Sequence, residues 1–298
     1  MTTLHRDALT GEWVSLNGDR QSRPVTDFET TCPFCPGPSS EVGELPFDVA
    51  VFENKFPAFR HPGNAEVVVY SPRHYDDLAY LPPARARLIW KVWADRVHDL
   101  EEEPGTRAVF IFENRGQKVG ATIGHPHGQI YAYPYIPPRL QTELRYFAQT
   151  CPLCRDVPDT LVLSRGRYWR LEVPWALRMP YQVHLVPERH VGSLGELGED
   201  EQREGARMMQ QLLRAYDRFF GMRTALVMAL YQTPAARAPY HLRWDFMPID
   251  RGGGKIKYLA GSELAMGAFV VDMVPEQVRE RLKPALDWEE QEEEKLGE

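Results

Sequence analysis

The chain has 298 residues, of which 43% are hydrophobic and 26% are charged, and its net charge at pH 7 is −7. This length and hydrophobic content suffice for one large domain or two smaller ones. The acidic balance argues against nucleic acid as the main partner, because nucleic-acid-binding proteins usually present a basic surface. No apolar run approaches the roughly 20 residues needed to span a membrane, and the N-terminal segment does not resemble a signal peptide. We therefore expect a cytoplasmic protein without a membrane segment.

Two series of predicted elements follow one another along the chain in the same order. The first consists of a strand, a helix with apolar residues at helical spacing and two further strands, at 66–70, 84–100, 107–112 and 129–133. The second repeats this order at 182–186, 199–220, 225–231 and 242–248. Strands with an intervening helix, twice over, predict an α+β fold in which strands of one sheet pair across the repeat.

Cysteine and histidine residues are placed at matching intervals in the two series. The first set is Cys32, Cys35, His74 and His125, and the second is Cys151, Cys154, His190 and His241. Corresponding cysteines lie 119 residues apart and corresponding histidines 116 residues apart. Two thiolates and two imidazoles form the closed shell of a structural zinc site, so we predict a zinc ion in the first set and a second one in the other. The alternatives are core cysteines with loop histidines, or a redox Cys-x-x-Cys pair, and both explain the matching histidines less well.

The two series differ at three positions that a purely structural repeat would not need. The segment 124–129 reads Gly-His-Pro-His-Gly-Gln, whereas 240–245 reads Tyr-His-Leu-Arg-Trp-Asp. The metal-type histidine is retained, but a constant offset replaces His127, Gln129 and Asn114 by Arg243, Asp245 and Leu230. We therefore place the chemistry in the first half.

His127 is the candidate nucleophile, because an imidazole can attack phosphorus and later leave from it. Residues two apart on a strand share a face, so Gln129 can donate its amide N–H to a phosphoryl oxygen beside His127. The polar, glycine-containing loop before them can surround phosphates with backbone N–H groups, and Arg20 and Arg23 can add positive charge. The alternatives are that both histidines of the His-Pro-His segment are metal ligands only, and that the loop and the arginines are ordinary surface.

The His-Pro-His-Gly-Gln motif, with its upstream Cys-x-x-Cys pair, resembles the galactose-1-phosphate uridylyltransferase family, a branch of the histidine-triad superfamily. The resemblance extends from about Asp7 to Glu276 and implies a duplicated histidine-triad-like unit, with helices packed on an antiparallel sheet. We accordingly predict a first half at 1–136, a linker at 137–150, a second half at 151–286 and a solvated acidic helical tail at 287–298.

The resemblance implies a ping-pong reaction. UDP-glucose transfers its uridylyl group to the histidine matching His127 and releases glucose 1-phosphate, and galactose 1-phosphate then accepts the group. Gln129 matches the glutamine that steadies this intermediate, and the first Cys/His set matches the family's zinc ligands. The family's nucleotide-contacting positions correspond to Arg20, Arg23, Phe52, Asn54, Asn114, Gly120 and Thr122. Its members are homodimers whose partner subunit contributes hexose contacts, matched here by Lys257, Tyr258 and Glu263.

Two departures from the family leave the substrate open. Arg243, Trp244 and Asp245 stand where some members carry a His-x-His iron-binding pair, and the second Cys/His set suggests a second zinc, as in plant-type nucleotidyl phosphorylases. Phe269 stands near the position of a hexose-binding glutamine. The alternatives are therefore an adenylyl transferase or phosphorylase acting on ADP-glucose or dinucleoside polyphosphates, a histidine-triad hydrolase, and a non-enzymatic two-zinc scaffold. We find no clustered carboxylates that would predict a magnesium site.

Overall fold

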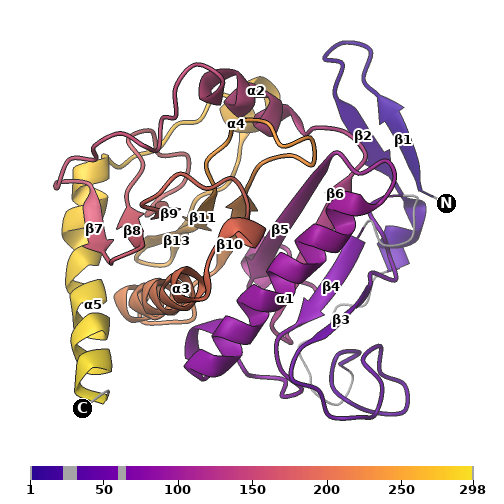
Figure 1. Cartoon of the computed structure of the whole chain (residues 1–298), viewed down its shortest axis with the longest axis horizontal. Coiled ribbons are helices and arrows are strands. Elements are labelled where there is room, and N and C mark those ends of the chain that lie inside the picture. The colour runs from indigo at the N-terminus through magenta and orange to yellow at the C-terminus, as the bar shows by residue number, and fades with distance from the viewer. Residues whose placement is uncertain (1, 23–31, 60–64, 297–298) are drawn as a thin grey trace.

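The computed structural model describes residues 2–22, 32–59 and 65–296, and its main feature is one nine-stranded sheet (Figure 1). Each strand is antiparallel to its neighbours, in the order β3-β4-β6-β5-β10-β11-β9-β8-β7. The strands are β3 (Ala50–Glu53), β4 (Ala65–Val69), β5 (Ala108–Arg115), β6 (His127–Tyr133), β7 (Val162–Arg165), β8 (Trp169–Glu172), β9 (Val183–Pro187), β10 (Leu226–Tyr231) and β11 (Arg243–Pro248).

Helices and short elements complete the fold. The helices are α1 (Pro83–Glu102), α2 (Pro138–Phe147), α3 (Glu199–Phe220), α4 (Gly261–Met266) and α5 (Pro275–Leu296). Two small antiparallel pairs lie outside the main sheet, β1 (Thr3–Arg6) with β2 (Trp13–Leu16) and β12 (Asp250–Gly252) with β13 (Lys255–Ile256). The 3-10 helices are η1 (Gly18–Ser22), η3 (Leu78–Tyr80), η4 (Gln117–Val119) and η5 (Leu194–Glu196). Within the described ranges, no helix combines the length and apolarity needed to cross a membrane.

The strand order is that of a duplicated unit. The series β3-β4-β6-β5 is followed by β10-β11-β9-β8, which contains the corresponding strands in the opposite spatial order. The two series meet where β5 pairs with β10. In Figure 1, α1 and α3 lie on the same face of the sheet, one from each series. The predicted α+β fold, its antiparallel sheet and the pairing across the repeat are confirmed. The boundaries of the two halves stay a prediction, and α2 occupies most of the predicted linker.

The sheet register corrects one detail of the comparison between the halves. His127 and Arg243 begin the corresponding strands β6 and β11. Arg243 is paired with Tyr231, whereas the β5–β6 register, continued two residues past its last pair, sets Asn114 opposite His127. The counterpart of Asn114 is therefore Tyr231 and not Leu230. The constant offset fails here because the connection from this strand to the metal-type histidine is one residue longer in the first half.

The largest side chains of the core lie between the sheet and the helices. Trp90 and Trp93 on α1 contact Trp244 on β11, with ring centroids 5.9 and 5.0 Å from it. Helix α3 approaches closely because Gly205 has no side chain, and a Cβ there would lie 2.5 Å from the Trp90 ring. Alternate residues of β5 and β6 enter this core and their neighbours face away from α1 and α3. We call this second side the open face of the sheet, and it is available for a site.

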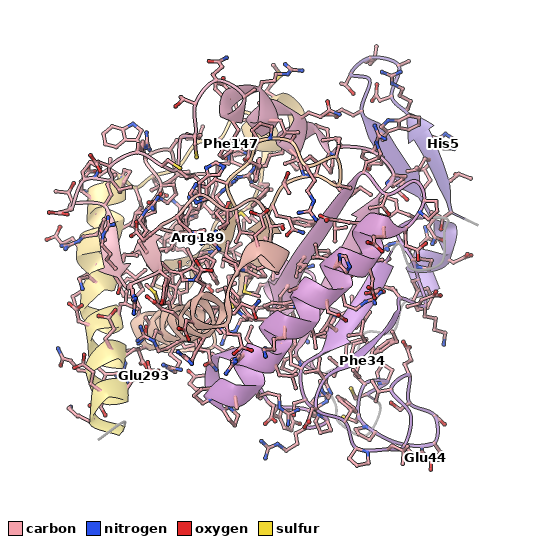
Figure 2. The ribbon with its side chains drawn as sticks, viewed as in Figure 1. His5, Phe34, Glu44, Phe147, Arg189 and Glu293 are labelled. Carbon is pink, nitrogen blue, oxygen red and sulfur yellow. The ribbon has the colours of Figure 1, made fainter. Side chains whose placement is uncertain are left out.

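The acidic C-terminal segment is helical, as expected, but it is not simply solvated. It belongs to α5, which packs against α3 beside β7 (Figure 1). The buried Glu289 accepts hydrogen bonds from Arg214 and Arg218 on α3, with Nε–O distances of 2.9 and 3.0 Å. Farther along, Glu293, near the end of α5 in Figure 2, accepts a hydrogen bond from Gln211 of α3. The expectation of a solvated tail is therefore wrong at Glu289, because α3 supplies two cations that compensate the buried charge.

Helix α2 is held against the second half by charged side chains. Glu143 accepts hydrogen bonds from Arg243 at 2.7 Å, from Arg139 at 3.1 Å and from the Tyr240 hydroxyl. Burial alone would raise the pKa of Glu143. The charges of Arg243 and Arg139 and the hydrogen bond from Tyr240 outweigh burial and lower this pKa from 4.5 to about 2.

Glu143→Gln should therefore lower the free energy of unfolding by about 2 kcal/mol at pH 7. Because the folded-state pKa lies below the unfolded one, this stabilisation is complete above about pH 4.5 and is lost as the pH falls toward 2. Urea unfolding of both proteins across this range measures the difference, with the exposed Glu103→Gln as control. A difference that does not shrink on acidification would contradict the ion pairs described here.

Candidate active site

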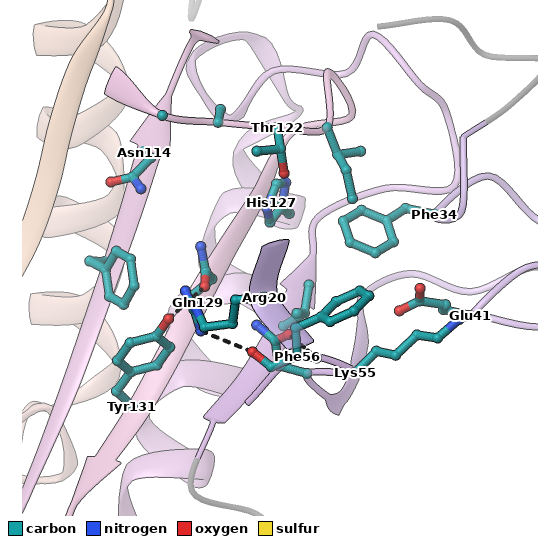
Figure 3. Close-up of a pocket in the computed structure, with 16 residues that line it drawn as sticks. Arg20, Phe34, Glu41, Lys55, Phe56, Asn114, Thr122, His127, Gln129 and Tyr131 are labelled. Atoms are coloured by element: carbon teal, nitrogen blue, oxygen red, sulfur yellow. Dashed lines mark hydrogen bonds between the residues drawn. The ribbon is translucent and has the colours of Figure 1, made fainter. Parts of the chain in front are cut away.

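A pocket on the open face of the sheet gathers most of the predicted catalytic and substrate-binding residues (Figure 3). His127, Gln129 and Tyr131 line it from one face of β6, where they alternate with buried residues. Asn114 on the neighbouring β5 lines it beside them. Arg23 lies outside the described residues. The other predicted residues in its wall are Arg20, Asn54, Gly120 and Thr122.

His127 is fixed in one tautomer by the backbone. Its Nδ1 lies 2.8 Å from the carbonyl oxygen of His125. A carbonyl oxygen can only accept a hydrogen bond, so Nδ1 carries the proton and Nε2 keeps a free lone pair. Burial lowers the pKa of His127, and the hydrogen bond to His125 opposes this only in part. The ring of Phe34 packs edge-on against the imidazole, with 5.1 Å between centroids. The imidazole is therefore an oriented candidate nucleophile, and burial favours its neutral form.

The first Cys/His set is assembled immediately before this strand. Its four ligand atoms lie within 4.8 Å of one another. Cys35 Sγ is 3.4 Å from His74 Nδ1, and Cys32 Sγ is 3.6 Å from His125 Nδ1. Metal–sulfur and metal–nitrogen bonds of about 2.3 and 2.0 Å in a tetrahedron give donor separations of roughly 3.5 Å, so the spacing fits one metal ion. The second ring nitrogen of His125 donates to the carbonyl of Ser71 at 2.8 Å, which directs an unprotonated Nδ1 at the thiols.

The second Cys/His set has the same construction, and its ligand atoms also lie within 4.8 Å of one another. Cys154 Sγ is 3.3 Å from His190 Nδ1, and Cys151 Sγ is 3.3 Å from His241 Nδ1. His241 Nε2 donates to the carbonyl of Pro187 at 3.1 Å, as its counterpart does in the first set. Both predicted sets are thus brought together, and each can hold a metal ion. None of the four cysteines, all of which the structure describes, forms a disulfide.

Ion pairs occupy the equivalent place in the second half. Arg243 stands at the position of the candidate nucleophile, where its guanidinium lies 4.3 Å from the centre of the Tyr231 ring and pairs with Glu143. Asp245 stands at the position of the amide and accepts a hydrogen bond from Gln182 at 2.8 Å. These side chains satisfy one another, which supports placing the chemistry in the first half.

Some predicted contacts lie elsewhere in the structure. Phe52 is not among the described residues that line the pocket, but its ring packs against Phe34 with 5.6 Å between centroids. Lys257 forms an ion pair with Glu263, and Tyr258 is exposed. In the described part of one chain, these three residues do not line the pocket that contains the candidate nucleophile.

The described lining of the pocket includes nine residues that were not anticipated from the sequence, among them Tyr131, Phe34 and Lys55. Tyr131 continues the alternation of His127 and Gln129, so the period of two would have identified it. Phe34 stands between the two cysteines of the first set, and the metal-type loop carries it to the pocket. Lys55 follows β3 and also lines the pocket, but no motif marks it.

Residues 53–137 match the N-terminal domain of the galactose-1-phosphate uridyl transferase family. A galactose-1-phosphate uridylyltransferase of Thermotoga maritima is 32% identical, in an alignment that covers 95% of this chain and 98% of the relative. This chain belongs to the galactose-1-phosphate uridylyltransferase family. Another galactose-1-phosphate uridylyltransferase, from Streptomyces lividans, is 32% identical over 97% of this chain and 88% of its own.

Solved structures agree with this assignment to the uridylyltransferase family. A uridylyltransferase structure with 30% sequence identity superimposes with a TM-score of 0.87 and covers 97% of this chain and 99% of that chain. An ADP-glucose phosphorylase from Arabidopsis thaliana, with bound ADP-glucose, gives a TM-score of 0.76 at 22% identity and covers 95% of this chain and 99% of that chain. The second likeness concerns the fold alone.

Proposed function

We propose that this protein transfers the uridylyl group of UDP-glucose to galactose 1-phosphate through a covalent intermediate on His127. The observation that carries the proposal is the fixed tautomer of His127, which leaves its Nε2 lone pair free in the pocket. In the first step, Nε2 attacks the α-phosphorus, the bond to the bridging oxygen breaks and glucose 1-phosphate leaves. In the second step, a phosphate oxygen of galactose 1-phosphate attacks the same phosphorus, which releases UDP-galactose and the free imidazole.

The surrounding side chains suit a transferring phosphoryl group. Gln129 follows His127 on the same face of β6, so its amide N–H can reach a non-bridging oxygen on which charge develops. Asn114 and Thr122 add polar groups to the wall of the pocket, and Arg20 adds a positive charge. We assign phosphate and nucleotide binding to these residues, together with Asn54 and Gly120.

We further propose that both Cys/His sets hold zinc. Thiolate and imidazole donors at tetrahedral separations suit zinc better than they suit magnesium or calcium. Four protein ligands close the shell, so the ion supplies structure and offers no open position to a substrate. In the first set, the bound ion would immobilise His125, and the carbonyl of His125 holds His127 in its tautomer.

A homodimer would give a role to the segment after β13. Lys257 and Glu263 are paired there, and the neighbouring Tyr258, Leu264 and Met266 are 70%, 73% and 80% exposed. Exposed apolar side chains in one short segment suit a partner surface. We propose that this segment reaches the pocket of the partner subunit and contacts the hexose. We place the protein in the cytoplasm, where cysteines without disulfides stay reduced.

Incubation of the protein with UDP-glucose, without acceptor, should give an acid-labile adduct of uridylyl mass in intact-protein mass spectrometry. Galactose 1-phosphate should then discharge the adduct and yield UDP-galactose. ADP-glucose in a parallel sample should give no adduct. An adenylyl adduct alone would assign the protein to the adenylyl transferases, and rapid loss of the adduct to water would indicate a hydrolase. A metal-loaded protein that forms no adduct with either sugar nucleotide would overturn the covalent mechanism.

A further inference from the structure

A buried polar pair lies behind the strand that carries His127. Tyr70, which follows β4, directs its hydroxyl at Gly128, so that a Cβ on Gly128 would lie 2.5 Å from the hydroxyl oxygen. This hydroxyl donates a hydrogen bond of 3.0 Å to Glu113 Oε2 on β5. Tyr70 is 0% exposed and Glu113 is 4% exposed. Both side chains therefore lie on the core side of the sheet, and neither lines the substrate pocket.

The same place in the second half is apolar. Trp244 corresponds to Gly128, and it is paired with Leu185 on one side and Leu230 on the other. By the register described above, Leu230 corresponds to Glu113. These three apolar side chains are completely buried. The fold can therefore fill this position by packing alone, and it does not need a polar pair there.

A carboxyl group in such a place has a cost. Burial and, to a smaller extent, the charge of Asp77 raise the pKa of Glu113 to about 7, although Arg115 and Arg223 oppose the shift. The side chain also lines a small cavity whose other walls include His127. Among the described residues, the second half has no polar pair around Trp244, and the pair in the first half lies directly behind the candidate nucleophile, which points to a role in the reaction.

We propose that Tyr70 and Glu113 are positioning residues, which fix the position of the β6 backbone at Gly128 relative to the substrate pocket. The proposal rests on the function proposed above. The hydroxyl meets the strand at Gly128, midway between His127 and Gln129, and Glu113 fixes where the hydroxyl lies. A backbone shift at Gly128 would move both neighbouring side chains. Misplacement of reacting groups by about 1 Å costs about 100-fold in rate.

Tyr70→Phe removes the hydroxyl and keeps the ring. We expect the single-turnover rate of adduct formation at saturating UDP-glucose to fall about 10-fold or more, with less than about a 3-fold change in KM, because the pocket lining is intact. Leu185→Ala, a buried substitution beside Trp244 in the second half, is the control for lost stability. It should lower thermal stability at least as much, yet leave the single-turnover rate of the metal-loaded protein unchanged. A merely structural role for Tyr70 predicts the same behaviour in both variants.

Gly128→Ala tests the contact from the other side. The added methyl collides with the Tyr70 hydroxyl, so the single-turnover rate should fall about 100-fold. In the Gly128→Ala background, adding Tyr70→Phe should restore part of the lost rate, because the next ring atom lies 3.3 Å from the new Cβ. In the otherwise unchanged enzyme, the same Tyr70→Phe substitution should lower the rate. Rescue of this kind requires direct contact between the two residues.

Two outcomes would overturn the positioning role and leave the proposed function in place. One is a Tyr70→Phe protein that forms the adduct at the unaltered rate, and the other is a double variant no faster than Gly128→Ala. An unaltered protein that forms no adduct would overturn the proposed function, and the positioning role would fall with it.

Discussion

Replacing His127 by Asn is expected to abolish the covalent adduct and to lower the rate of uridylyl transfer by about 10⁴-fold or more. The amide N–H of Asn can take the place of Nδ1–H and keep the hydrogen bond to the His125 carbonyl. The variant has no nitrogen lone pair where Nε2 stands, so no bond to phosphorus can form. Intact-protein mass spectrometry measures the adduct, and a steady-state assay of UDP-galactose formation measures the rate.

His98 provides the matched control, because it lies on α1 with 65% of its side chain exposed. His98→Asn should keep both the adduct and the transfer rate. If His127→Asn still formed an adduct of the same mass, the nucleophile would be a different residue. If it lost the adduct but kept the rate, the transfer would be direct and the two-step mechanism would be wrong.

The second large effect is expected from Cys35→Ser. This sulfur faces both imidazoles of its set, at 3.4 Å from His74 Nδ1 and 3.6 Å from His125 Nδ1. We expect the unaltered chain to hold two metal ions and the variant to hold one, and the free energy of unfolding of the variant should fall by about 3 kcal/mol or more. Adduct formation should slow by about 10- to 100-fold, because His125 loses its anchor and its carbonyl no longer fixes His127. Metal analysis, urea unfolding and single-turnover kinetics give the three quantities.

Cys154→Ser makes the same change in the second set and separates stability from chemistry. It should also remove one ion and destabilise the fold, but the adduct should form at nearly the unaltered rate, because Arg243 stands where the first set supports a nucleophile. An equal slowing in both variants would show that the metal acts only through overall stability. A full metal complement in either variant would contradict the ligands assigned to that set.

Periodicity and duplication account for what could be predicted from the sequence. The predicted helix at 199–220 agrees with α3 at both ends, where Glu199 opens an acidic first turn and Gly221 ends the helix at φ 68°. The two Cys/His sets could be recognised because the same residue types recur at matching intervals in both copies of the repeat. The alternation of His127 and Gln129 on one strand face predicted their common pocket, and the structure brings them together.

The parts that could not be predicted depend on contacts between elements. A constant offset matches Asn114 to Leu230, but one extra residue in a connecting segment moves the match to Tyr231. Glu113 and Tyr70 interrupt an apolar pattern, and spacing along the chain does not show that they meet behind Gly128. The charge pattern of the acidic C-terminal segment likewise does not show which of its carboxylates is buried and pairs with arginines of another helix.

The pairing of β5 with β10 has a consequence for how substrates exchange. Main-chain hydrogen bonds continue through this junction, so the halves cannot swing about a hinge as domains joined by a linker do. Glucose 1-phosphate therefore has to leave, and its replacement has to enter, without a hinge motion between the two halves. The repeat is likewise a single unit of unfolding, because separating the halves would strip two neighbouring strands of their partners at once.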